Sequence, residues 1–217
     1  SAAKPFIVMG VLGVFLLAQP DLGSTVVLFV ITFGMLFIVG ANFWQFILLI
    51  GTGILLFVWL VLSASYRLKR FTGFLEPFKD PYGTGFQLTN SLMAFGRGEI
   101  SGEGLGNSIQ KLDYLPEAHT DFIMAIIGEE FGFIGILVVV ILLGLLIFRA
   151  MKIGRESLML EQRFRGFFAL GISFWIFFQG FVNLGMALGM LPTKGLTFPL
   201  VSYGGSSIII MSATVGI

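Results

Sequence analysis

Long runs of apolar residues, separated by short polar breaks, dominate the chain. A helix needs roughly 20 such residues to cross a bilayer. The pattern therefore predicts six membrane-spanning helices, the first short and the last truncated: 5–19, 22–39, 45–62, 121–148, 166–190 and 202–217. Because the last run has no polar tail, we expect the chain to be part of a longer protein.

Composition supports a membrane protein and excludes other classes. Hydrophobic residues make up 56% of the 217 and charged residues 12%, about half the share of roughly 25% in soluble domains. Only four charges lie within residues 5–62, 122–148 and 166–217: Asp21, Glu129, Glu130 and Lys194. A net charge of +1 without a basic stripe excludes an extended nucleic-acid surface, and the absence of cysteine excludes disulfides and thiolate metal sites. We predict an all-α, polytopic helical membrane protein.

Basic residues predict the orientation of the chain, because cytoplasmic loops are enriched in Lys and Arg. Loop 149–165 carries five such residues and is expected in the cytoplasm. The longer loop 63–120 has six, balanced by six carboxylates, and is expected outside. Alternation of the spans then places the 191–201 connection outside as well.

The expected organisation has three parts: three helices over 1–62, a large extracytoplasmic loop over 63–120, and three helices over 121–217. The loop is too long for a passive connector. Its 88–95 segment (LTNSLMAF) indicates a short interfacial helix, or equally an amphipathic packing element.

Two carboxylates precede the fourth span. Pro116 suits the first turn of a helix, which would put Glu117 and Asp121 one turn apart on one face, with His119 pointing elsewhere. Paired carboxylates raise the pKa of one member, giving a proton acceptor, or share a divalent cation. An acidic residue also simply favours a helix N-terminus, which explains Glu117 equally well. Asp121, at the membrane edge, is the stronger functional candidate.

Glu129 and Glu130 lie about two turns further along the apolar run. Carboxylates within a membrane are costly and normally face a cavity or a partner. Adjacent helical residues diverge by about 100°, so the two cannot serve one site. We expect a structural ion pair, in which one of the two carboxylates pairs with a basic residue from a segment outside this chain.

The stretch LPTKGLTFPLVSYGGSS (191–207) predicts an anion pocket. Two prolines break the helix, and Lys194 supplies the only charge of the region. The last helix then begins among small residues whose N–H groups suit a phosphate oxygen: Ser202, Gly204, Gly205, Ser206 and Ser207. Such a pocket would fit a lipid-linked diphosphate, although the same small residues also allow close helix packing. Gln179 and Asn183, four apart on the preceding span, are interpreted as interhelical packing devices.

Three blocks of this sequence, AQPDLGS (18–24), LMAFGRGEISGEGLGNSIQKLDYLPEAHTDFIMAIIGEEFG (92–132) and GMLPTKGLTFPLVSYGGSS (189–207), resemble the SEDS family of peptidoglycan glycosyltransferases. PEAHTDF and PTKGLT resemble the cell-division branch more than the elongation branch. The resemblance implies a fold of ten spans with both termini in the cytoplasm, of which this chain would supply the carboxy-terminal six.

The resemblance also implies an activity. The family joins lipid II units into β-1,4-linked glycan strands outside the cytoplasmic membrane, and Asp121 would be the catalytic carboxylate. Lys194 and the Ser202–Ser207 helix start would stabilise the departing diphosphate, with Glu117 and His119 beside the substrate. A divalent cation, Mg²⁺ or Mn²⁺, could assist on Asp121 or on the diphosphate.

Partners follow from the same resemblance. We expect a class B penicillin-binding protein of the FtsI type, other divisome proteins of the FtsQ, FtsL and FtsB types, and a place in the inner membrane at the division septum. Two other functions stay open at this point. A lipid II flippase would need charges along a path at mid-depth, and a non-catalytic divisome scaffold would not need Asp121.

Overall fold

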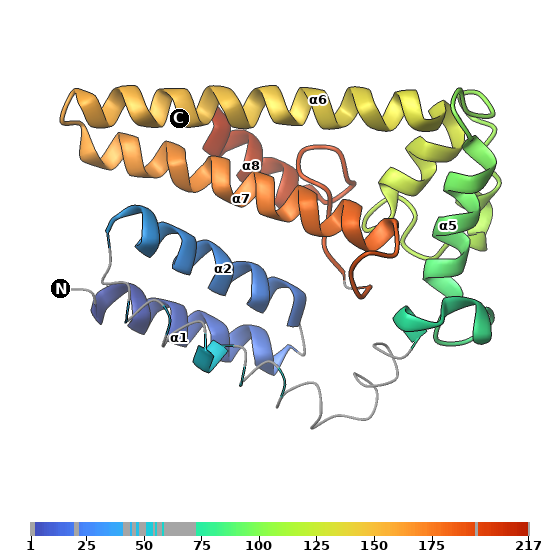
Figure 1. Ribbon diagram of the computed structural model, residues 1–217, viewed down its shortest axis with the longest axis horizontal. Coiled ribbons are helices and arrows are strands. Elements are labelled where there is room, and N and C mark those ends of the chain that lie inside the picture. Colours follow the sequence, from blue (N-terminus) through green and yellow to red (C-terminus); the bar gives the residue numbers. More distant parts are fainter. Residues whose placement is uncertain are drawn as a thin grey trace. The chain divides into compact units, whose positions relative to one another are not determined.

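The computed structural model describes residues 3–19, 22–40, 73–193 and 195–216, with a few positions between 44 and 58. Lys194 and most of the predicted 45–62 span lie outside the described residues. All regular elements of the described part are helices (Figure 1). The prediction of an all-α fold is therefore confirmed.

The chain divides into two compact units. The first comprises Ser1–Ser63 with Ile147–Phe178, and the second Ala64–Leu146 with Gln179–Ile217. In the first unit, helices α1 (Ala3–Ala18) and α2 (Leu22–Ile38) pack against each other, close to the predicted ranges. The second unit contains the long loop, helix α5 (Phe86–Gly98) and helix α8 (Gly205–Gly216), and it holds the candidate site.

Helices α6 (Ile123–Met159) and α7 (Arg163–Ala187) are long and apolar enough to cross a membrane, and α1, α2 and α8 contain shorter apolar helices. The predicted loop 149–165 is helical except for the turn at 160–162. Arg, Lys and Glu end the apolar run there but are good helix formers, so the helix outlasts the hydrophobic pattern. Gly154 and Gly166 bring the two helices into close backbone contact near this turn.

Helix α6 is broken at Gly132, where the backbone adopts φ 64° and ψ −161°. Figure 1 shows the first turns of α6, next to α5, changing direction before the long remainder. A Cβ at Gly132 would overlap the backbone of Ile100, so only glycine allows this approach. The prediction of one continuous helix over 121–148 is therefore wrong.

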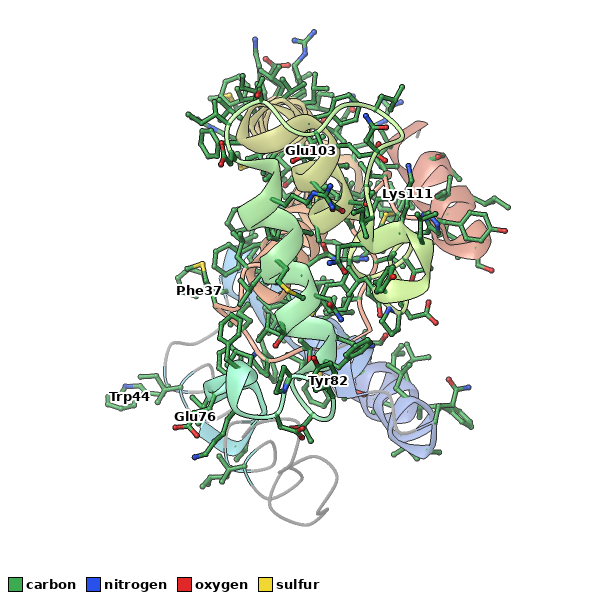
Figure 2. The ribbon with its side chains drawn as sticks, turned by 90° about the vertical axis from the view of Figure 1, so that its right-hand side faces the viewer. Phe37, Trp44, Glu76, Tyr82, Glu103 and Lys111 are labelled. Atoms are coloured by element: carbon green, nitrogen blue, oxygen red, sulfur yellow. The ribbon has the colours of Figure 1, made fainter. Side chains whose placement is uncertain are left out.

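Helix α5 supports the second unit. Figure 2 looks onto α5, with Glu76 and Tyr82 near its N-terminal end and Glu103 nearer its C-terminal end. The buried Ser91 hydroxyl donates to the carbonyl of Ala187, at the end of α7, over 2.7 Å. A buried apolar cluster lies among α5, α6 and α7: Ala94, Leu115, Ala118, Phe122, Ala125, Ile126 and Ala187. The predicted helix near 88–95 is thus present and has one buried face.

Candidate functional site

The segment that carries Asp121 is a series of turns. Glu117 has a left-handed backbone, φ 57°, and α6 begins only at Ile123. The Glu117 carbonyl accepts hydrogen bonds from the N–H groups of Thr120, Asp121 and Phe122, at 3.2, 3.0 and 3.2 Å. The prediction that Pro116 opens a helix, with Glu117 and Asp121 stacked on its face, is therefore wrong. A positive φ is incompatible with that helix.

The side chains around Asp121 have separate surroundings. The Glu117 carboxylate accepts a 2.7 Å hydrogen bond from the hydroxyl of Thr120. The side chain of His119 is exposed, and Asp121 is partly buried. The three predicted residues therefore share one turn, with Asp121 the most enclosed.

Three consecutive carbonyl groups of this turn are held from the distal part of the chain. The N–H of Tyr203 donates to the carbonyl of His119 over 2.8 Å. The hydroxyl of Ser202 donates to the carbonyl of Thr120. The amide of Asn183 donates to the carbonyl of Asp121 over 2.8 Å. The backbone of the candidate catalytic residue is thus fixed by contacts that are far away in sequence.

The PTKGLT turn (residues 192–197) lies beside the Asp121 side chain at Gly195. A Cβ added to Gly195 would stand 3.2 Å from Oδ2 of Asp121. Gly195 follows Lys194 in the sequence, although the placement of Lys194 itself is not described. The structure therefore brings together the two motifs that the sequence singled out, at the level of Asp121 and Gly195.

Polar side chains of α7 hold the same turn. Asn183 Nδ2 also donates to the carbonyl of Leu196. Gln179 Nε2 donates to the carbonyl and the hydroxyl of Thr197, at 2.9 and 3.2 Å. These two amides were interpreted as interhelical packing devices. They instead tie α7 to a loop, because loop carbonyls without ladder partners need donors when buried.

The start of α8 divides into a buried and an exposed part. Ser202 is 2% exposed; its hydroxyl accepts from the Phe198 N–H over 2.6 Å and donates to Thr120. Both hydrogen-bonding roles of this hydroxyl are therefore used internally, so the expected Ser202 contact to an anion is replaced by a structural one.

The remaining residues at the start of α8 are more open. Gly205 and Ser206 are exposed, and Gly204 is partly exposed. Ser207 Oγ lies 3.5 Å from the Thr197 hydroxyl, on the turn that flanks Asp121. The first turn of α8 thus faces the same region as Asp121, and an anion contact at these residues stays a prediction.

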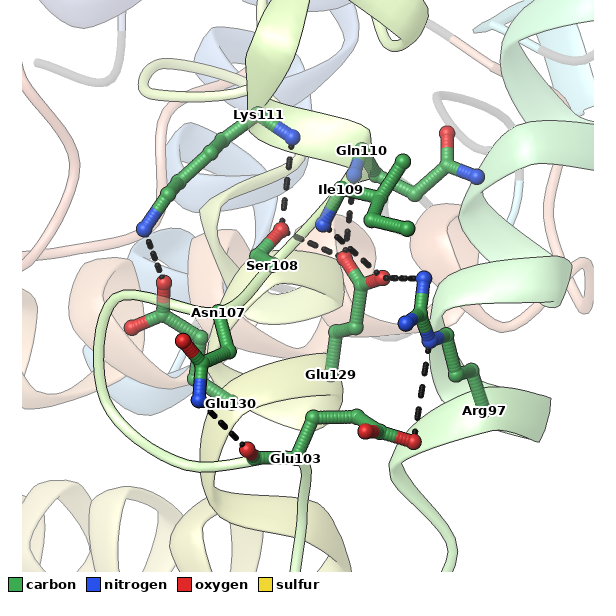
Figure 3. Close-up of polar contacts among 9 residues, drawn as sticks. All are labelled: Arg97, Glu103, Asn107, Ser108, Ile109, Gln110, Lys111, Glu129 and Glu130. Atoms are coloured by element: carbon green, nitrogen blue, oxygen red, sulfur yellow. Dashed lines mark hydrogen bonds and ion pairs between the residues drawn. The ribbon is translucent and has the colours of Figure 1, made fainter.

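Glu129 is the centre of a buried polar cluster just before the break in α6 (Figure 3). It is 0% exposed. Its carboxylate accepts from the hydroxyl of Ser108 and, at 3.2 Å each, from the N–H groups of Ile109 and Gln110. Arg97 of α5 lies 3.7 Å away. This cluster fastens the loop to α6.

Glu130 forms its own ion pair, 2.6 Å from the ammonium of Lys111. The prediction of structural ion pairs for Glu129 and Glu130 is confirmed. The expectation that a basic partner lies outside the chain is wrong, because Arg97 and Lys111 belong to the 63–120 loop. The break at Gly132 lets this loop reach both carboxylates.

The sequence allows a divalent cation on Asp121. No group of three His, Asp or Glu side chains that could hold a metal ion occurs among the described residues. The described residues therefore do not form a cage for a divalent cation. We derive no step through a metal.

The family of the chain follows from comparison of its sequence. The sequence profile of the FtsW, RodA and SpoVE cell cycle proteins matches residues 1–217. The chain belongs to this family of helical membrane proteins.

Among curated relatives, the chain resembles probable peptidoglycan glycosyltransferases FtsW. It is 88% identical to that of Haemophilus influenzae and 83% identical to that of Pasteurella multocida, each over 217 residues, and 59% identical to that of Escherichia coli over 212 residues. The alignments cover 98–100% of this chain. The chain spans about half the length of these relatives, between 51% and 55%.

Two solved structures share the fold. One belongs to a peptidoglycan synthase complex studied for the structural coordination of polymerization and crosslinking, with TM-score 0.76 and 30% identity. The other is an aspartate-to-alanine mutant of the rod shape determining protein RodA from Thermus thermophilus, with TM-score 0.62 and 28% identity. Each match covers 99% of this chain and 59% or 54% of the other.

Proposed function

We propose that this chain forms the catalytic part of a peptidoglycan glycosyltransferase that polymerises lipid II into β-1,4-linked glycan strands during septal cell-wall synthesis. The observation that carries the proposal is the approach of Gly195 to the Asp121 carboxylate. This approach supports Asp121 as a proton acceptor next to the turn that bears the only cation of the 166–217 segment. The names of the relatives supply the class of reaction.

In the proposed reaction, Asp121 accepts the proton of the GlcNAc 4-hydroxyl of one lipid II unit. The oxygen attacks the anomeric carbon of the MurNAc of another unit as the bond to the undecaprenyl diphosphate breaks. One displacement inverts the α-linked donor into a β-linked product, so no covalent intermediate on the enzyme is needed. The rigid backbone of the His119–Asp121 turn keeps the carboxylate in place for this transfer.

The departing diphosphate develops negative charge that needs stabilisation. Lys194 and the exposed first turn of α8, at Gly205 and Ser206, are the groups we assign to it. Glu117 and His119 lie on the turn beside Asp121 and are assigned to the surrounding sugar. A divalent cation carried by the diphosphate would add charge without requiring a protein cage.

The expected partner is a class B penicillin-binding protein at the septum, joined by other divisome proteins. The solved peptidoglycan synthase complex that shares this fold coordinates polymerization and crosslinking. Such coupling requires the nascent strand to pass from a glycosyltransferase to a transpeptidase. The proposal for this chain rests on its 30% identity to that structure.

The competing functions make different demands on the same residues. A flippase needs mobile charges at mid-depth, whereas Glu129 and Glu130 are fixed to Arg97, Ser108 and Lys111 at the bend of α6. A scaffold would tolerate loss of the Asp121 carboxylate. The orientation proposed from the basic residues places Asp121 outside, where the polymerase requires it.

The test uses the full-length parent protein with its cognate partner, the transpeptidase blocked, and labelled lipid II. Wild type should yield glycan ladders on a gel, and Asp121→Ala and Asp121→Asn should yield none while still binding the partner. Glu156→Gln, which alters an exposed carboxylate paired with Lys152 at 3.8 Å, is the matched control and should behave as wild type. Ladders from the Asp121 variants would remove this residue from the mechanism. No ladder from folded wild type would favour the flippase or the scaffold.

A further inference from the structure

We propose that Asn183 is a positioning residue, which sets the Asp121 carboxylate against the PTKGLT turn through one side-chain amide. This inference rests on the proposed function and adds a residue outside the expected site. Asn183 lies on α7, and its amide touches the backbone of both candidate motifs. One side chain thereby contacts both motifs.

The hydrogen-bond geometry fixes the role of the amide. Nδ2 carries two hydrogens, one for the carbonyl of Asp121 at 2.8 Å and one for the carbonyl of Leu196. Both acceptors are backbone carbonyls, so a flipped amide would place oxygen against oxygen twice. Only the observed orientation satisfies both contacts.

The other polar atom of Asn183 shows that the donor function is what the site requires. Oδ1 is buried and has no hydrogen-bond partner among the described residues, and the side chain is 0% exposed. A buried acceptor without a partner is unfavourable. A residue needed only to fill space would avoid this penalty with an apolar side chain of similar size.

Gln179 provides an internal comparison, four residues earlier on α7. Its amide donates to the carbonyl and hydroxyl of Thr197. Both amides thus hold the PTKGLT turn, and Asn183 in addition donates to the carbonyl of the proposed base. Loss of Gln179 should therefore perturb the turn alone, and loss of Asn183 should perturb the turn and the base together.

This difference predicts a kinetic signature. A displacement of about 1 Å at a reacting group can lower the rate about 100-fold. Replacing Asn183 should lower kcat by about this factor while changing KM for lipid II much less, because the base acts only in the transition state. Replacing Gln179 should raise KM more than it lowers kcat, because the turn that carries Lys194 is assigned to substrate binding.

The experiment measures initial rates of lipid II polymerisation by the full-length complex, normalised to folded protein by size-exclusion chromatography and thermal unfolding. The variants are Asn183→Leu, similar in size without donors, Asn183→Asp, which places acceptors against the two carbonyls, and Gln179→Leu. Ser91→Ala is the control, since it deletes an equally buried bond to a backbone carbonyl, that of Ala187. We expect a loss of kcat per folded molecule in both Asn183 variants and a normal kcat in Ser91→Ala.

The outcomes separate the two proposals. Wild-type ladders with a normal kcat in either folded Asn183 variant would overturn the positioning role and leave the polymerase intact. Absence of wild-type ladders would instead refute the proposed function. If neither variant folds, Asn183→Ser, which keeps one donor at smaller volume, is measured in the same way. A normal kcat for Asn183→Ser would overturn the role, and an intermediate kcat would support it.

Discussion

Gly98 at the end of α5 touches the backbone of Gly128 in α6. A Cβ added to Gly98 would overlap the carbonyl oxygen of Gly128, and backbone atoms cannot rotate away as a side chain can. This contact seats the loop-borne helix on the first turns of α6. The close approach of these two glycines therefore sets how closely α5 packs against the first turns of α6.

Gly98→Ala should destabilise the protein, by about 1–3 kcal/mol or more, because overpacking against backbone cannot relax cheaply. The measurement is the midpoint of thermal unfolding of the full-length protein in detergent. Gly96→Ala, in the same helix with open space around it, should leave the midpoint unchanged or slightly raised. Equal midpoints for the two variants would refute the contact.

Glu129→Gln should lower the free energy of unfolding by about 3 kcal/mol, because it leaves buried donors and Arg97 without their carboxylate. Glu103→Gln is the control, since Glu103 also faces Arg97, at 3.6 Å, but is 42% exposed. We expect less than about 1 kcal/mol for that control. Chemical unfolding monitored by tryptophan fluorescence would show whether the two variants differ.

Gly195→Ala should reduce polymerisation about tenfold with little effect on folding, because the new Cβ must displace the Asp121 carboxylate by a few tenths of an ångström. Gly144→Ala on α6 adds the same methyl group in open space and serves as the control. Initial rates with labelled lipid II report the difference. A fully active Gly195→Ala would show that the approach of the PTKGLT turn to Asp121 is unimportant for catalysis.

Lys194→Ala should weaken the use of lipid II by roughly tenfold to 100-fold, the value of a hydrogen bond to a charged group. Binding of the penicillin-binding protein should be retained, as judged by co-purification. Lys152→Ala removes an exposed cation near the α6–α7 turn and should change neither lipid II use nor partner co-purification. Unchanged turnover would remove Lys194 from the proposed site.

The expected orientation predicts which residues are accessible to a reagent on the extracytoplasmic side of the membrane. Single cysteines at Leu105 and Met159, both well exposed, can be placed in a cysteine-free full-length background. An impermeant maleimide added to intact spheroplasts should label Leu105→Cys and spare Met159→Cys. The reverse labelling would invert the orientation and place Asp121 on the cytoplasmic side.

Sequence patterns predicted the helices well where burial in the bilayer alone decides the structure. Apolar runs located α1, α2, α7 and α8 closely. The same reasoning failed at Gly132, because the break comes from the close approach of the Ile100 backbone, which does not change the hydropathy pattern of the helix. It also failed at 149–165, where charged residues continue a helix beyond the apolar run.

The candidate site was predicted in part. Asp121 and the PTKGLT turn were found from residue type and resemblance, and the structure brings them together at Gly195. Asn183 and Ser202 were given other roles, because their partners are backbone carbonyls, which every residue possesses. No pattern of side chains could have indicated which carbonyls lie within reach.

The break at Gly132 has a mechanical consequence for helix α6. A continuous helix would transmit any rocking of its bilayer portion directly to Asp121, as a rigid rod does. Here the nine residues from Ile123 to Phe131 are clamped to the loop, while the long remainder of α6 begins after a joint. Tilting of the long part of α6 would therefore reach the Asp121 turn along this helix only across the joint at Gly132.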